Sequence, residues 1–387
     1  MRSPLSGNPA GREATVAVVV LPLVITLVVL LFAWPAGRTA PRHVPVGIVG
    51  TGAASQHAVE GLVREKPGAF DFHLYPDQQD ARAAIENRDV YGALAISAHD
   101  ITVLTAPAAS TSVAQLLREV GQQLADRAAQ QGAAGPQSSA KIHVTALDVV
   151  PVATEDPRGV VFSSAVFPLT ICAILIGAFV STARGLRRPW HRLLTLLLAC
   201  AAAGLGAYLV AQGFLGALPH DHLATWAVLS LVLISISATA AGLVRLLGHG
   251  GLGLSAALMV FVGNPFSGAG SAPELLPKGV DYVGQWLPPG AGASLLRDTA
   301  YFDGNGGSGH LAVLALWSVC GFTAVMFGRR ITGRAPGATS GATASGASLS
   351  SLPTSGAASP GRRHTHAHAH ARRNDDDGRL RTLHAGR

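Results

Sequence analysis

The sequence predicts an α-helical membrane protein with six transmembrane helices and an extracytoplasmic α/β domain inserted between helices 1 and 2. Three observations lead to this fold class. Only 13% of the 387 residues are charged, which is about half of the share found in soluble globular proteins. Hydrophobic residues make up 49% of the chain and gather in runs long enough to cross a bilayer. Between the first two runs, residues 42–159 alternate between short strand and helix patterns.

The first apolar run, residues 14–34, follows a short N-terminal segment, residues 1–13. It is longer than the roughly 7–15 residues of a signal-peptide core. We therefore expect an uncleaved transmembrane anchor. If the run were a cleaved signal peptide, the topology expected for the rest of the chain would be unchanged.

The segment 42–159 predicts a small α/β domain with the element order βαβαββαβ. The expected strands are Val44–Gly50, Phe70–Tyr75, Val90–Ile96, Ile101–Ala106 and Ile142–Val150, and the expected helices are His57–Glu65, Asp77–Asn87 and Ser110–Gln131. The acidic residues around the second helix have the spacing of a solvated face, and the histidines are scattered singly. Neither pattern predicts an acid/base pair or a metal site.

Five further apolar runs predict transmembrane helices 2–6 within residues 160–330. They cover residues 160–183, 190–213, 223–247, 251–268 and 310–328, of which the fourth in this list is short and rich in Gly and Ser. Arginines cluster in the loops after residues 183 and 328, which by the positive-inside rule places both termini in the cytoplasm. Arg38 and Arg42, after the first run, count against this orientation.

The interiors of these runs contain no Asp, Glu or Lys. Proton-coupled carriers usually have ionisable residues within the membrane, so this absence counts against a proton-driven mechanism. The polar residues in the interiors of these runs are uncharged and include Gln212, Ser235, Ser237 and Thr239. Packing between helices explains them best, and the lining of a substrate path is the alternative.

The most distinctive segment is the loop 264–309, whose prolines and glycines interrupt any continuous helix. We expect a re-entrant or interfacial hairpin with Leu295 and Leu296 facing the bilayer and Arg297 and Asp298 facing water. Its aromatic residues would lie at the headgroup level, namely Tyr282, Trp286, Tyr301 and Phe302. The candidate residues for a transport path or an outer-loop function are Asn264, Pro265, Pro288, Pro289, Gly290 and Arg297.

The motif matches in the sequence do not predict an enzyme. A P-loop requires lysine directly after glycine, and none of Lys66, Lys141 and Lys278 follows one. The GxGxxG match at Gly248–Gly253 lies between two apolar runs rather than between a strand and a helix. The three cysteines lie apart, inside apolar runs. We therefore expect no catalytic residues and no cofactor.

The C-terminal segment, residues 331–387, predicts a disordered cytoplasmic tail rich in His and Arg. His364, His366, His368 and His370 alternate and are a weak candidate for binding a metal ion. The net charge of +7 comes mostly from arginines in the expected cytoplasmic loops and in this tail. This distribution favours orientation in the lipid bilayer and predicts no nucleic-acid partner.

Four stretches carry a resemblance to a known family. They are VPVGIVG (44–50), YPDQQDARAAIENRDVYGALAI (75–96), VVPVATEDPRG (149–159) and LPPGA (287–291). Together with the anchor and the order of elements, they make the chain similar to the ABC-2 type permease superfamily, in particular to the YhgE/Pip-like bacterial membrane proteins. The resemblance implies a multi-pass protein of the cell membrane, a homodimer or heterodimer, an export path between the spans, and a separate ATPase subunit.

Two hypotheses about function remain open at this point. The first is a permease-like subunit of an ABC-2 type exporter that lacks its own ATPase. The second is a non-transporting membrane protein whose extracytoplasmic domain binds a cell-envelope component, a phage or a partner protein.

Overall fold

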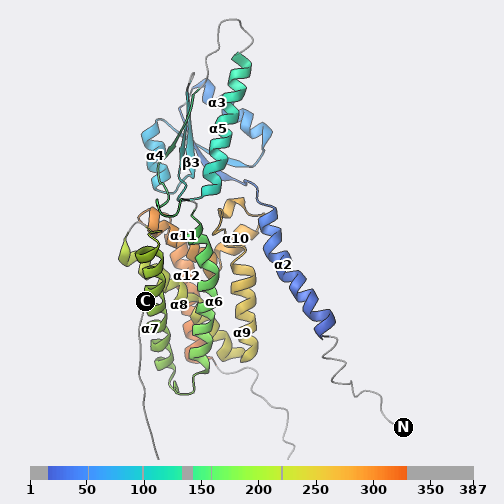
Figure 1. Cartoon of the computed structure of the whole chain (residues 1–387), viewed down its shortest axis with the longest axis vertical. Coiled ribbons are helices and arrows are strands. Elements are labelled where there is room, and N and C mark those ends of the chain that lie inside the picture. The colour runs from blue at the N-terminus through green and yellow to red at the C-terminus, as the bar shows by residue number, and fades with distance from the viewer. Residues whose placement is uncertain are drawn as a thin grey trace, which may run out of the picture. The chain divides into compact units, whose positions relative to one another are not determined.

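The computed structural model describes residues 16–50, 52–97, 100–132, 143–157, 159–218 and 221–328 (Figure 1). The N-terminal segment 1–13 and the tail 331–387, including the four alternating histidines His364, His366, His368 and His370, lie outside the described residues.

The α/β region contains a five-stranded sheet and three helices, in the order expected from the sequence. The elements are β1 (Val44–Val49), α3 (Ala53–Glu65), β2 (Phe70–Tyr75), α4 (Gln78–Glu86), β3 (Gly92–Ile96), β4 (Asp100–Thr105), α5 (Thr111–Gly132) and β5 (His143–Asp148). The strand order in the sheet is β2-β1-β3-β4-β5. All neighbouring pairs are parallel except β3 and β4, which form an antiparallel pair.

The core of the α/β region follows from local patterns in the sequence. Val44, Val46 and Ile48 alternate along β1 and therefore share one face of the sheet, and all three are fully buried in the hydrophobic core. Asp77 caps α4, since its side chain accepts hydrogen bonds from the backbone N–H groups of Gln79 and Asp80. The inner face of α4 is apolar and buried, and consists of Ala81, Ala84 and Ile85.

Five helices are long and apolar enough to cross a membrane. They are α2 (Leu21–Gly37) with the preceding π-helical turn η1 (Val16–Val20), α6 (Val160–Thr182), α7 (Pro189–Tyr208) with η2 (Leu209–Phe214), α8 (His222–Leu247) and α12 (Ser308–Phe327). The α/β region joins the chain between α2 and α6. The described residues therefore form a multi-pass membrane protein with a mixed sheet region.

The fifth predicted span, residues 251–268, is shorter in the structure. Helix α9 (His249–Ala256) and the π-helical segment η3 (Ala257–Gly263) end before Asn264 and Pro265. The combined helix His249–Gly263 has 15 residues, or about 22 Å at 1.5 Å per residue, whereas a bilayer core is about 30 Å thick. The predicted count of six long spans is therefore five in the described residues, plus this shorter helix.

Helix α8 is the central helix of the bundle and packs against α6, α7, α11 and α12. The residues from Ser235 to Gly242 are all buried, and most of them are small. They allow close approach: a Cβ on Gly177 of α6 would lie 2.3 Å from the carbonyl oxygen of Ser237. The Ser237 hydroxyl donates a hydrogen bond to the Ala173 carbonyl at 2.7 Å. These contacts support helix packing as the role of Ser237, as the sequence favours.

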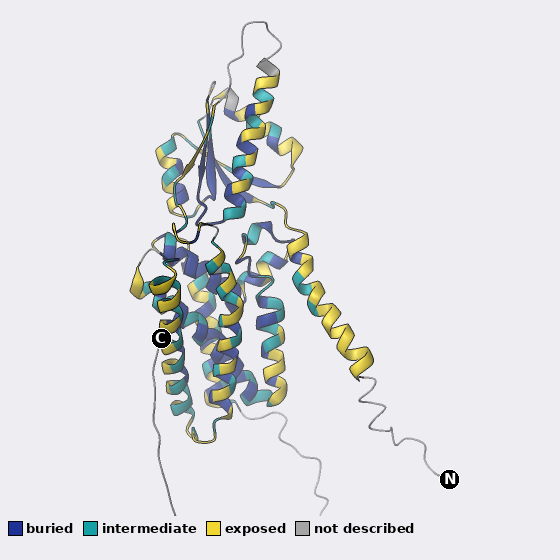
Figure 2. Cartoon of the chain, viewed as in Figure 1, coloured by how far each residue is buried: buried dark blue, intermediate teal, exposed yellow. Residues whose placement is uncertain are grey.

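The loop 264–309 forms three short helices, η4 (Pro273–Leu275), α10 (Val280–Gln285) and α11 (Pro288–Tyr301). Every residue of α11 from Pro288 to Ala300 is buried, as the dark blue ribbon shows (Figure 2). The expectation that Leu295 and Leu296 face the bilayer while Arg297 and Asp298 face water is therefore wrong. The physical reason is that α11 packs against α8 and α12 on one side and has the α/β region on the other.

Some aromatic residues of this loop are exposed, as predicted, and others are buried. Tyr282 and Trp286 are 66% and 49% exposed, as a headgroup-level position requires. Phe302 is only 3% exposed and belongs to the hydrophobic core of the α/β region. Its expected place at the membrane surface is wrong, because the chain turns there toward the sheet rather than toward lipid.

Candidate functional site

The loop 264–309 is built into the α/β region. Ala272, Leu275 and Phe302 are buried in the same hydrophobic cluster as the sheet. The backbone N–H groups of Ala40 and Arg42, which connect α2 to β1, donate hydrogen bonds at 3.0 Å to the carbonyls of Leu275 and Glu274. The contact between the loop and the α/β region is called the junction below. It links sequence segments that are more than two hundred residues apart.

Arg42 gives the junction its first charged contact. Its Nη1 donates to the Leu275 carbonyl at 2.9 Å and to the Leu276 carbonyl at 2.7 Å. Arg42, whose charge counts against the orientation predicted from the loops, thus has a structural role. It satisfies carbonyl groups next to the short helix η4, which have no helical partner.

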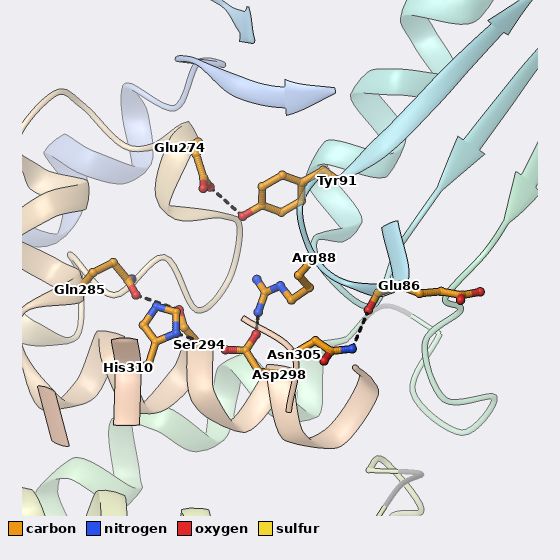
Figure 3. A network of polar contacts seen from close by, with 9 residues as sticks. All are labelled: Glu86, Arg88, Tyr91, Glu274, Gln285, Ser294, Asp298, Asn305 and His310. Atoms are coloured by element: carbon orange, nitrogen blue, oxygen red, sulfur yellow. Dashed lines mark hydrogen bonds and ion pairs between the residues drawn. The ribbon is translucent and has the colours of Figure 1, made fainter. Parts of the chain in front are cut away.

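Tyr91 makes the second contact. It lies just before β3, is 8% exposed, and donates its hydroxyl hydrogen to Glu274 Oε2 at 2.7 Å (Figure 3). Burial, followed by the negative charge of Glu274, raises the pKa of Tyr91 well above its usual value. The phenol therefore keeps its proton at neutral pH and remains a donor to the carboxylate.

Arg88, Asp298 and His310 make the third contact (Figure 3). Arg88 follows α4 in the left-handed backbone region, with φ of 61°, where a non-glycine residue is strained. Its guanidinium forms an ion pair with Asp298, whose side chain is 1% exposed, and lies 5.3 Å from the centroid of the Phe302 ring. His310 Nδ1 is 3.1 Å from the other carboxylate oxygen of Asp298. The strained backbone directs Arg88 into this pair.

Arg297 lies beside this group and faces the loop itself. It is 7% exposed, and its Nη2 donates to the carbonyl of Ala269 at 2.9 Å. Burial, and then the nearby positive charge of Arg88, lowers the pKa of Arg297 to about 10. The guanidinium is therefore still charged at neutral pH. The predicted outer-loop candidate Arg297 thus belongs to the junction, as an internal tie and not as a surface group.

Apart from Arg42, whose guanidinium donates to backbone carbonyls, the charges of the junction are balanced. Arg88 and Arg297 carry two positive charges, and Glu274 and Asp298 carry two negative ones. A cavity of about 170 Å³ is lined by Arg88, Tyr91, Glu274, Asp298 and His310 with four other residues. Each carboxylate already has a partner within the chain. The arrangement is thus suited to holding the α/β region onto the helices, and it offers no activated nucleophile.

The other predicted candidates gather beside the junction. Asn264 and Pro265 line a cavity of about 430 Å³ together with Phe32 of α2 and Phe167 of α6. The Asn264 amide donates from Nδ2 to the Met259 carbonyl at 3.1 Å. Asn264 thereby caps the C-terminal end of the short helix η3, within the segment for which we predicted a full span.

Pro288, Pro289 and Gly290 begin α11, and all three are buried. The ring of Pro289 lies against Gly263, so that α11 starts on the end of η3. A Cβ on Gly290 would lie 2.2 Å from the carbonyl oxygen of Gly284. Only glycine fits this approach between α10 and α11. These residues shape the loop, and their place in a transport path stays a prediction.

The sequence did not identify Arg88, Tyr91, Glu274, Asp298 and His310 as one group. A signal is present in retrospect, because Arg88 and Tyr91 lie in the stretch 75–96 that carries the family resemblance. Their partners lie on three other elements, and no local pattern connects them. Among the described residues, no group of three His, Cys, Asp or Glu side chains is placed to hold a metal ion.

A third cavity lies among the membrane helices and is mostly apolar. It has a volume of about 510 Å³ and is lined by residues of α6, α7, η2 and α8 together with Leu296 of α11. The lining includes Pro168, Cys172 and Gly206. Such a cavity has the size and the character of a site for an apolar ligand.

The fold and the junction define a class of protein, a multi-pass membrane protein whose α/β region is fastened to its helices by a buried polar network. The particular family follows from comparison: the family model for ABC-2 family transporter proteins matches residues 14–328. The chain belongs to this family, which makes it a permease-like membrane component and confirms the resemblance at the level of the ABC-2 type permeases. Among curated proteins, none matches the chain.

Proposed function

We propose that the chain is the membrane-spanning subunit of an ABC-2 type exporter and that a separate ATPase subunit supplies the energy. The family match over residues 14–328 is the observation that carries this proposal. The absence of any Gly-Lys pair from the 387 residues supports a separate ATPase, because a P-loop needs that lysine to reach the phosphates.

The ATPase docks at the end of the bundle that lies opposite the α/β region. This end contains the loop between α6 and α7, with Arg184, Arg187 and Arg188 exposed. The positive-inside rule places such a loop in the cytoplasm, where ATP is available. Both termini then lie in the cytoplasm, and the α/β region lies outside the membrane.

The substrate is lipophilic. Support comes from the apolar cavity of about 510 Å³ among α6, α7 and α8, whose lining contains no charged residue. The junction at the outer end of the same helices gives the exporter a way to couple movement of α11 to the α/β region, since Asp298 and Leu296 lie on one helix. The subunit works as a dimer, and we place it with the YhgE/Pip-like proteins.

Co-purification from native membranes in mild detergent tests this proposal. The tagged full-length chain is expected to retain an ATPase subunit. The double variant Arg187→Gln/Arg188→Gln, which changes exposed loop residues only, is expected to lose most of it. The matched control is Arg38→Gln, which removes an exposed arginine next to the α/β region.

The alternative is a membrane protein that does not transport. If the intact chain retains no ATPase, or if Arg38→Gln and the loop variant behave alike, the exporter proposal is wrong. Orientation is measured separately with a membrane-impermeant thiol reagent on Gln79→Cys and Gly185→Cys, two exposed positions in the α/β region and in the arginine loop. Only Gln79→Cys is expected to react in intact cells.

A further inference from the structure

A cavity of about 570 Å³ lies at the end of the helix bundle opposite the α/β region. The ends of α6, α8 and α12 and the start of α7 meet there. Its lining consists of Ser181, Thr182, Arg184, Arg192, Val244, Arg245 and Gly328. Neither the transport path nor the junction includes any of these residues, and only Arg184 also belongs to the loop proposed to dock the ATPase.

The charges of this cavity are unbalanced, in contrast to those of the junction. Three of the seven lining residues are arginines. The described chain segments that form this end, residues 173–200, 240–262 and 318–328, contain no Asp or Glu. A cavity with positive charge and no carboxylate nearby attracts an anion, because the charges repel one another until a negative group is bound.

Two of the arginines are prepared for a ligand. Arg192 is held in place by its own chain, since its Nε donates to the Leu186 carbonyl at 2.6 Å and its Nη1 to the Ser181 carbonyl at 2.5 Å. The Nε of Arg245 is shielded from solvent and has no hydrogen-bond partner among the described residues. A buried donor without an acceptor costs free energy, and an anion in the cavity would remove that cost.

The position of the cavity favours a lipid phosphate as the anion. Trp190, in the first turn of α7, is 50% exposed and contacts His191, with ring centroids 3.7 Å apart and ring planes tilted by 37°. Exposed tryptophans mark the headgroup level of a bilayer. Arg184 and Arg192 lie close to Trp190 in sequence, which supports a position of the cavity's mouth at the depth of lipid phosphates.

The size of the cavity supports the same source. Its volume of about 570 Å³ equals that of roughly 19 water molecules in the liquid. A free phosphate ion fills only a small part of this space, whereas a phosphate with its glycerol groups fills much more. Arginine is also the side chain best suited to phosphate, because its planar group donates two parallel hydrogen bonds.

We propose that this cavity binds the phosphate headgroup of an anionic phospholipid, with Arg245 and Arg192 as its direct ligands and Arg184 at its mouth. The bound lipid ties the ends of α6, α8 and α12 together at the membrane surface. This inference depends on the membrane location of the chain and is independent of whether the chain transports a substrate.

Native mass spectrometry of the full-length chain in detergent tests the proposal. The probes are phosphatidylglycerol and phosphatidylcholine, which differ in net charge, and the variants are Arg245→Gln and Arg184→Gln. Each variant is expected to weaken retention of phosphatidylglycerol about fivefold, the effect of one arginine near anionic lipid. Because Arg184 is exposed, its variant keeps the fold and remains informative if Arg245→Gln fails to fold.

The matched control is Arg187→Gln, an exposed arginine of the same loop that does not line the cavity. Retention equal to that of the unchanged chain supports a defined site. Three results would overturn the proposal: equal weakening by Arg187→Gln, equal retention of phosphatidylcholine, or displacement of the lipid by excess inorganic phosphate. The last result would assign the cavity to a free anion.

Discussion

Helix α2 is more apolar than helix α11, and yet α2 is exposed whereas α11 is buried. Of the five candidate spans, α2 is the most apolar, and Pro35 is the one buried residue that the structure describes on it. Helix α11 contains Arg297 and Asp298, and it is buried from Pro288 to Ala300. Figure 2 shows α2 mostly in yellow, whereas the bundle helices mix blue, teal and yellow.

The difference teaches which property of a membrane protein's sequence reports packing. A leucine on α2 loses nothing in contact with lipid, because lipid tails are as apolar as the side chain. Arg297 and Asp298 have no such option and need partners within the protein. High hydropathy therefore indicates contact with lipid, and small or charged residues indicate contact with protein.

The largest effect is expected from Asp298→Ala. It leaves Arg88 buried without its ion-pair partner, which costs about 3–5 kcal/mol. Thermal unfolding in detergent should show this loss, and limited proteolysis should release the α/β region from the helices. Such a loss would strengthen the contrast between the two helices, because one charged contact of α11 would then contribute more to stability than any apolar contact of α2.

The control for this prediction is Asp89→Ala, which removes an exposed carboxylate one residue from Arg88. It is expected to change stability by less than about 0.5 kcal/mol. The double variant Arg88→Met/Asp298→Leu should recover part of the loss, because no charge is left unpaired. Equal melting temperatures for Asp298→Ala and Asp89→Ala would show that the junction does not hold the molecule together.

A smaller loss is expected from Gly290→Ala. The added Cβ would lie 2.2 Å from the Gly284 carbonyl oxygen, and overpacking of this kind costs about 1–3 kcal/mol. Gly309→Ala is the matched change, because a Cβ on this helical glycine meets nothing within 4 Å. The difference in melting temperature between the two variants measures how tightly α11 is packed, and no difference would contradict the close packing.

Much of the fold could be predicted from sequence because its signals are local. The order of strands and helices in the α/β region follows from alternation of apolar residues and from a cap such as Asp77. The long spans follow from hydropathy alone. The fifth predicted span corresponds to a shorter helix, because Asn264 and Pro265 end the helix before the apolar run is complete.

The junction could not be predicted, because its partners are set by tertiary structure. Arg88 and Tyr91 meet Asp298 and Glu274 across more than one hundred and eighty residues. The pattern Leu295–Leu296–Arg297–Asp298 was interpreted as part of a hairpin at the membrane surface, which assumes one apolar and one aqueous neighbour. Protein covers both sides of α11, so this amphipathic interpretation was wrong.

The smallest effect is expected from Leu30→Ala on α2. Leu30 is 57% exposed, so its truncation should change stability by less than about 0.5 kcal/mol. The same change at Leu296 of α11, which is 8% exposed, provides the reference for a packed leucine. Thermal unfolding at several protein concentrations decides between lipid and protein as the neighbour of α2. A loss for Leu30→Ala that grows as the protein is concentrated would show that a second copy covers α2, and the contrast between the two helices would then hold only for the monomer.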